Sequence, residues 1–91
     1  MEFEEFKAQV GCPVVIESPV GEVRARIASV DRLGDGTGGK RIPFSMVLRA
    51  PAEPLLEQGT YPLAINQLAM ELFLVPIGPE GDQMCYEIVF N

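Results

Sequence analysis

One segment of the sequence comes close to a nucleotide-binding motif. Residues 34–41 read GDGTGGKR. In a phosphate-binding loop, glycine amides surround the phosphates, a lysine neutralises them, and the next residue is a Ser or Thr that holds magnesium. Arg41 takes the place of that Ser or Thr, and Pro43 predicts an extended segment where the motif requires a helix. We therefore interpret residues 34–39 as a surface loop and predict no bound nucleotide or other cofactor.

Carboxylates are the remaining candidates for acid–base chemistry. The sequence has no histidine, which removes Ser-His and Cys-His nucleophile pairs and a frequent zinc ligand. A general acid and base would require two carboxylates to converge after folding. The candidates are Glu2, Glu4, Glu5, Glu17, Glu22 and Glu87. Exposed strand faces and a solvated N-terminal turn also explain these acids, so we predict no catalytic residue, no bound metal and a protein that is not an enzyme.

The two cysteines do not form a redox or metal motif. Cys12 and Cys85 lie far apart in the sequence and have no CxxC spacing. We expect two reduced, half-buried thiols, although the spacing alone leaves their redox state open.

Length and composition are those of one small globular domain. The 91 residues are 47% hydrophobic and 22% charged, close to the globular average. We therefore expect a single domain over residues 1–91 with one core. The first residues lack the basic flank and apolar run of a signal peptide, and no stretch has the length of a membrane span. Cytoplasmic residence and no membrane partner are the resulting expectations.

The charge balance argues against nucleic acid as a partner. Thirteen acids against seven bases give a net charge of −6, and the bases are spread along the chain. The sequence has no tryptophan, and its aromatic residues do not alternate with basic ones. Neither a phosphate-binding patch nor a stacking platform for bases is predicted.

The apolar pattern predicts strands and one short helix. Phe3 and Phe6, with Val10 after them, have helical spacing over residues 2–9. Strand-like patterns occupy residues 14–16, 22–33, 42–50, 60–65, 70–77 and 84–90, with glycine and proline between them. We predict an all-β fold, a small antiparallel β-barrel or sandwich of about six strands with a short N-terminal helix. Periodicity does not decide between barrel and sandwich.

Alternation within these segments predicts which side chains face the core. Val23, Ala25 and Ile27 share one strand face, and the alternation slips at Ala28-Ser29, which indicates a bulge. In residues 42–50 the even-numbered positions are apolar. Residues 70–77 and 84–90 are predicted to form a hairpin around the loop 78–82, and Pro62 suggests a sheet edge.

Aromatic residues could line either a ligand pocket or the core. Tyr61, Phe73, Tyr86 and Phe90 are the candidates. An emptied centre would leave a domain of this size with too little buried surface. We therefore interpret them as core, with Tyr86, Ile88 and Phe90 on the inner face of the last strand.

The C-terminal half resembles a known family. The segments that carry the resemblance are Pro43-Phe44-Ser45 with Leu48, then residues 56–63, 72–78 and 86–91. This half is similar to a family of bacterial proteins of about 100 residues and unknown function, some of them encoded beside phage tail collar-like proteins. The sequence departs from the family pattern at residues 65–67 and 69–70. The resemblance implies a structural or accessory role linked to tail-like assemblies, without a catalytic signature.

Two hypotheses for function follow. The first is a non-catalytic structural or interaction module that contacts a protein partner or its own copy through an exposed sheet edge or a surface at Leu55, Leu56 and Tyr61. The second is a small-molecule-binding barrel, with or without weak enzymatic activity. A cavity lined by Tyr61 and Tyr86 would favour the second hypothesis.

Overall fold

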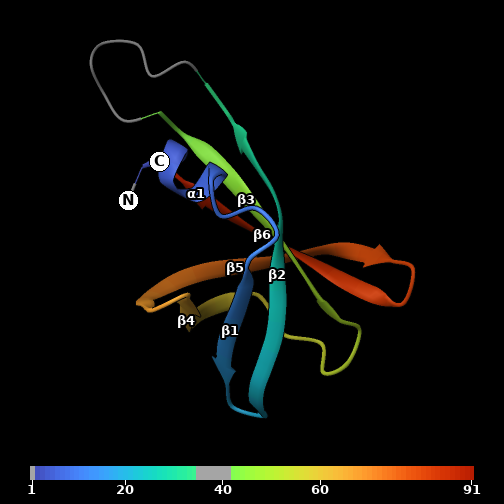
Figure 1. Cartoon of the computed structure of the whole chain (residues 1–91). Coiled ribbons are helices and arrows are strands. Elements are labelled where there is room, and N and C mark those ends of the chain that lie inside the picture. The colour runs from blue at the N-terminus through green and yellow to red at the C-terminus, as the bar shows by residue number, and fades with distance from the viewer. Residues whose placement is uncertain (1, 35–41) are drawn as a thin grey trace.

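The chain is described by a computed structural model that covers residues 2–34 and 42–91 (Figure 1). Within these ranges it forms one helix and six strands. The elements are α1 (Phe3–Lys7), β1 (Pro13–Ser18), β2 (Gly21–Arg32), β3 (Phe44–Pro51), β4 (Gly59–Ile65), β5 (Leu68–Glu80) and β6 (Gln83–Phe90). All strand pairs are antiparallel, and the order β1-β2-β3-β6-β5-β4 closes into a barrel. The all-β fold with a short N-terminal helix is confirmed, and its architecture is the barrel.

Strand β2 is long because it pairs with two neighbours in succession. Its first half, from Gly21 to Arg26, pairs with β1, and its second half, from Arg26 to Arg32, pairs with β3. The register with β3 shifts between Ile27 and Ser29, which is the bulge that the sequence predicts. The extra residue bends β2, so one strand forms a corner of the barrel (Figure 1).

Strand β5 forms the second corner in the same way. Residues 68–74 pair with β4, and the remainder pairs with β6, with a register shift between Pro76 and Gly78. Gly78 has a φ of +133°, which a residue with a side chain rarely adopts. The predicted loop 78–82 is therefore wrong in part, because Gly78, Pro79 and Glu80 continue the strand and the turn contains only Gly81 and Asp82.

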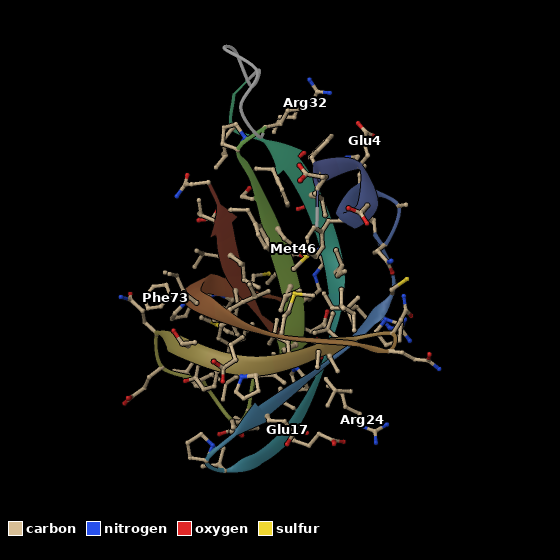
Figure 2. All side chains as sticks on the ribbon, turned by 90° about the vertical axis from the view of Figure 1, so that its left-hand side faces the viewer. Glu4, Glu17, Arg24, Arg32, Met46 and Phe73 are labelled. Carbon is tan, nitrogen blue, oxygen red and sulfur yellow. The ribbon has the colours of Figure 1, made fainter. Side chains whose placement is uncertain are left out.

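The barrel interior is filled with apolar side chains. Val23, Ala25 and Ile27 of β2 point inward, as predicted, and so do the even-numbered residues of β3. Figure 2 shows Met46 of β3 between the strands, and its side chain is fully buried. Tyr86 and Ile88 of β6 are also buried. Burial of this inner surface is the main favourable term in folding.

Helix α1 closes one end of the barrel with aromatic side chains. Phe3 and Phe6 are buried against Phe44 of β3, and Phe90 of β6 stacks on Phe44 with ring centroids 4.5 Å apart. Lys7 Nζ donates a hydrogen bond to the Val30 carbonyl oxygen, which ties the helix to β2. No helix in residues 2–34 and 42–91 has the length and apolar character to cross a membrane.

Two apolar residues lie outside the core, contrary to prediction. Val10 follows the end of α1 and is exposed, because the helix stops at Lys7 and the chain turns toward β1. Phe73 points away from the barrel (Figure 2) because Leu74 takes the inward position of β5.

The aromatic cluster generates a test of the fold. Phe90→Ala should lower the free energy of unfolding by about 3 kcal/mol, since it removes a half-buried ring from contact with Phe44 and Phe6. The neighbouring Val89 is exposed on the outer face, so Val89→Ala should change stability by less than about 0.5 kcal/mol. Urea denaturation measures both, and equal effects would show that the last strand does not carry core residues on the predicted face.

Candidate functional site

The barrel is least complete where β1 meets β4. Val14, Val15 and Ile16 pair with Ile65, Ala64 and Leu63, and in the described residues the ladder goes no further. Strand β1 continues through Ser18, and β4 starts earlier, at Gly59. The end of β1 and the start of β4 therefore diverge, and a hollow forms between them.

This hollow, which we call the seam groove, has a volume of about 270 Å³. It is lined by Pro19, Val20, Leu55, Leu56, Glu57 and Tyr61. Val20 lies in the turn between β1 and β2, and Leu55 lies in the connector between β3 and β4; their exposed fractions are 70% and 62%. The seam groove therefore has two large aliphatic side chains in solvent at its rim.

Two tyrosines hold the connector beside the barrel. The Leu56 N–H donates to Tyr86 Oη across 3.0 Å in a buried environment. The Tyr61 hydroxyl donates to the Glu57 carbonyl oxygen at 2.6 Å near the surface. Because a buried N–H without a partner is costly, the first bond fixes where the connector enters the core.

The three residues of the predicted surface, Leu55, Leu56 and Tyr61, differ in how far they are exposed. Leu55 is exposed and Tyr61 is half-buried, and both line the seam groove. Leu56 also lines the seam groove but is only 3% exposed and belongs to the core, so it lies beneath the rim, and its role as a contact residue stays a prediction. Leu55 is exposed and Leu56 is buried, and the Leu56 N–H is bonded to the buried Tyr86 hydroxyl. Val20, which sequence reasoning missed, completes the rim; its turn position, between Pro19 and Gly21, was the available signal.

A second hollow is lined by arginines from two strands that are distant in the sequence. It has a volume of about 580 Å³ and is lined by Arg24 and Arg26 of β2, Arg49 of β3, and Val10, Gly11, Pro13, Ala25, Ile27, Ala28, Pro51 and Gln83. We call it the arginine groove. The expectation that the bases do not cluster is wrong at this place, because Arg26 and Arg49 are opposite one another in the β2–β3 register. Sequence alternation placed both on outer faces, but the pairing of the strands was needed to bring them together.

The residues considered for chemistry do not form a common site. Glu17 and Glu22 are opposite one another in the β1–β2 hairpin, exposed, with Glu22 Oε1 at 3.3 Å from Arg24 Nη2. The other acids are on different elements: Glu2, Glu4 and Glu5 at α1, and Glu87 on β6. The described residues contain no group of three or more acids and cysteines that could hold a metal ion. Residues 35–41 of the phosphate-loop-like segment lie outside the described residues.

Both cysteines are free in the structure. Cys12 is half-buried just before β1, and Cys85 is buried on β6. The expected half-buried position holds for Cys12, whereas Cys85 is buried in its strand.

Comparison with known proteins identifies a family and no characterised relative. A family model described as a domain of unknown function (DUF6916) matches residues 1–90. The match extends through the N-terminal half, beyond the segments that carry the resemblance in the sequence. No curated protein and no solved structure matches the chain significantly. The association with phage tail-like assemblies stays a prediction.

The tyrosine contacts lead to a test of how the seam groove is held. Tyr86→Phe leaves the buried Leu56 N–H without its acceptor and should lower the free energy of unfolding by about 1–3 kcal/mol. Tyr61→Phe removes a hydroxyl near the surface, where water replaces the lost bond, and should change stability by less than about 0.5 kcal/mol. Thermal and urea unfolding measure the stability of both variants. A larger loss of stability in Tyr61→Phe than in Tyr86→Phe would show that the Leu56–Tyr86 bond is not what holds the connector.

Proposed function

We propose that this chain, which belongs to the family described as domain of unknown function DUF6916, is a non-catalytic interaction module that binds a protein partner through the seam groove. The observation that carries the proposal is the pair of exposed aliphatic side chains, Val20 and Leu55, at the rim of a hollow. Exposed apolar patches, especially beside a groove, mark sites of protein interaction. The barrel positions them, and the Leu56–Tyr86 bond keeps the connector in place.

Contact through side chains is favoured over addition of a strand. The start of β4 diverges from β1, so its backbone is open on that side in the described residues. Pro62 lies in this open part and has no N–H to donate. A proline at an edge discourages pairing with a further strand. The partner therefore contacts Leu55, Val20 and Tyr61 rather than extending the sheet.

The partner we expect is a component of a phage tail-like assembly, or a second copy of the chain. The first comes from the resemblance of the C-terminal half to proteins encoded beside tail collar-like proteins. The second is compatible with the exposed aliphatic rim, although a net charge of −6 on each copy opposes self-association. Sedimentation of the purified protein distinguishes the two partners, because it detects a second copy directly.

A non-catalytic role fits the chemistry of the seam groove. The seam groove has one carboxylate, Glu57, and no nucleophile paired with a base among its lining residues. The second hypothesis, a small-molecule-binding barrel, draws little support from the tyrosines. Tyr86 is fully buried and its hydroxyl is occupied by the Leu56 N–H, so it does not line the seam groove beside Tyr61.

The test compares two leucine-to-glutamate variants. Leu55→Glu places a charge at the rim and should abolish partner binding, with a change in stability below about 0.5 kcal/mol because the side chain is exposed. Leu33 is 55% exposed at the far end of β2, so Leu33→Glu is the matched control and should bind normally. Tagged wild type and both variants are used for affinity capture from lysate of the source cells, with quantitative mass spectrometry.

Loss of the same tail-like protein with Leu55→Glu, and not with Leu33→Glu, supports the proposal. Sedimentation of the purified proteins reports self-association, and a wild-type dimer that Leu55→Glu dissociates identifies a second copy as the partner. Equal capture profiles and equal sedimentation for all three proteins would contradict the seam groove as an interface.

A further inference from the structure

We propose that the arginine groove binds an extended acidic segment of a protein partner, with carboxylates on alternate residues. This surface is separate from the seam groove: it lies along β2 and β3, and the two hollows share no lining residue. The inference therefore does not depend on the proposed function.

The spacing of the three guanidinium groups follows from the strands that carry them. Arg24 and Arg26 are two residues apart on one face of β2, which separates their Cβ atoms by about 6.7 Å. Arg49 is opposite Arg26 on β3, where Cβ atoms are about 5 Å apart. An extended peptide repeats its side chains on one face with the same spacing of about 6.7 Å. Carboxylates at positions i and i+2 of such a peptide therefore have the same spacing as Arg24 and Arg26, so each can contact one arginine.

The arginines keep donors available for a ligand. Arg26 Nη1 donates to the Gly11 carbonyl oxygen at 2.9 Å, Arg49 Nη2 is 2.6 Å from Glu80 Oε1, and Arg24 Nη2 is 3.3 Å from Glu22 Oε1. Each guanidinium has five N–H donors, so one contact leaves most of them unused. Arg49 Nε is screened from solvent, so Arg49 offers a ligand only the N–H groups of its two Nη atoms.

Cross-strand pairing of like charges makes the groove receptive to anions. Arginines directly opposite one another repel and reduce the stability of the sheet. Glu80 and Glu22 neutralise part of this charge from the ends of β5 and β2. A carboxylate that bridges Arg26 and Arg49 would remove the remaining repulsion, and arginine binds carboxylates in a bidentate geometry.

Charge and shape together select a short peptide over a nucleic acid. A long polyanion would also meet the acidic remainder of a chain whose net charge is −6. The arginine groove has apolar walls from Val10, Pro13 and Pro51, which suit the intervening side chains of an extended peptide. A volume of about 580 Å³ is within the usual range of ligand sites.

The test uses a fluorescein-labelled peptide of alternating threonine and glutamate, followed by fluorescence anisotropy with the purified protein. Wild type should bind it more tightly than a peptide with glutamine in place of glutamate. It should also bind it more tightly than a peptide of the same composition with all glutamates consecutive. Equal affinity for the alternating and consecutive peptides would overturn the spacing argument, and no binding of the alternating peptide would overturn the proposal.

Substitutions of single arginines show whether the peptide binds in the arginine groove. Arg24→Gln should weaken binding about threefold, because the Arg24 side chain is 83% exposed and solvent screens an ion pair at that position. Arg49→Lys should weaken it several-fold although the charge is kept, because lysine lacks the planar fork. Arg32→Gln is the control, since Arg32 lies near Glu4 beside α1, away from the groove (Figure 2).

Two further measurements distinguish peptide binding in the arginine groove from binding at the seam groove and from binding of a free anion. Leu55→Glu should leave peptide binding unchanged, so failure of the seam groove and failure of the arginine groove give different results. Inorganic phosphate equimolar with the peptide should not displace it. Displacement would identify a free anion as the ligand and contradict the peptide, as would an equal loss of affinity in Arg24→Gln and Arg32→Gln.

Discussion

The structure depends on two strands that each belong to two ladders. Strands β2 and β5 pair first with one neighbour and then with another, and each has a register shift where it changes partner. A flat antiparallel sheet of these strands would have two open edges and one apolar face in solvent. Bending at Ile27–Ser29 and at Pro76–Gly78 brings β1 and β4 together and encloses that face. Closure, more than any single contact, allows so short a chain to bury a continuous core.

Both hollows follow from this closure. The corner in β2 makes Arg26 a neighbour of Pro13 on one side and Arg49 on the other, which gathers positive charge on the outer surface of the bend. The ladder between β1 and β4 ends at Ile16 and Leu63 although β1 continues to Ser18 and β4 begins at Gly59, so the two strands separate there. The connector that contains Leu55 and Leu56 then lies beside the opening. The buried bond from Leu56 to Tyr86 links the rim of the seam groove to the core.

The sequence predicts strand faces well where polar and apolar residues alternate. In β2, Arg24 and Arg26 separate inward residues, and the slip at Ala28-Ser29 located the bulge correctly. The same reasoning is weaker in β5, where every residue from Met70 to Ile77 except Glu71 is apolar, so only one polar side chain marks the outer face that Phe73 shares. Phe73 was therefore assigned to the core although it is exposed. Periodicity reports one strand at a time, whereas closure, the clustering of arginines and the inward turn of Leu56 depend on contacts between segments distant in sequence.

The two hollows differ in the range over which they attract a partner. A net charge of −6 produces a field that repels an acidic segment at long distance, so the arginine groove acts only within about one Debye length, roughly 10 Å at 0.1 M salt. Added salt weakens both this long-range repulsion and the short-range ion pairs. Selectivity among acidic peptides therefore comes from the bidentate geometry at Arg26 and Arg49. Val20 and Leu55 act through removal of apolar surface from water, which added salt does not screen. A partner that used both surfaces would therefore keep the apolar contact at high ionic strength and lose the acidic one.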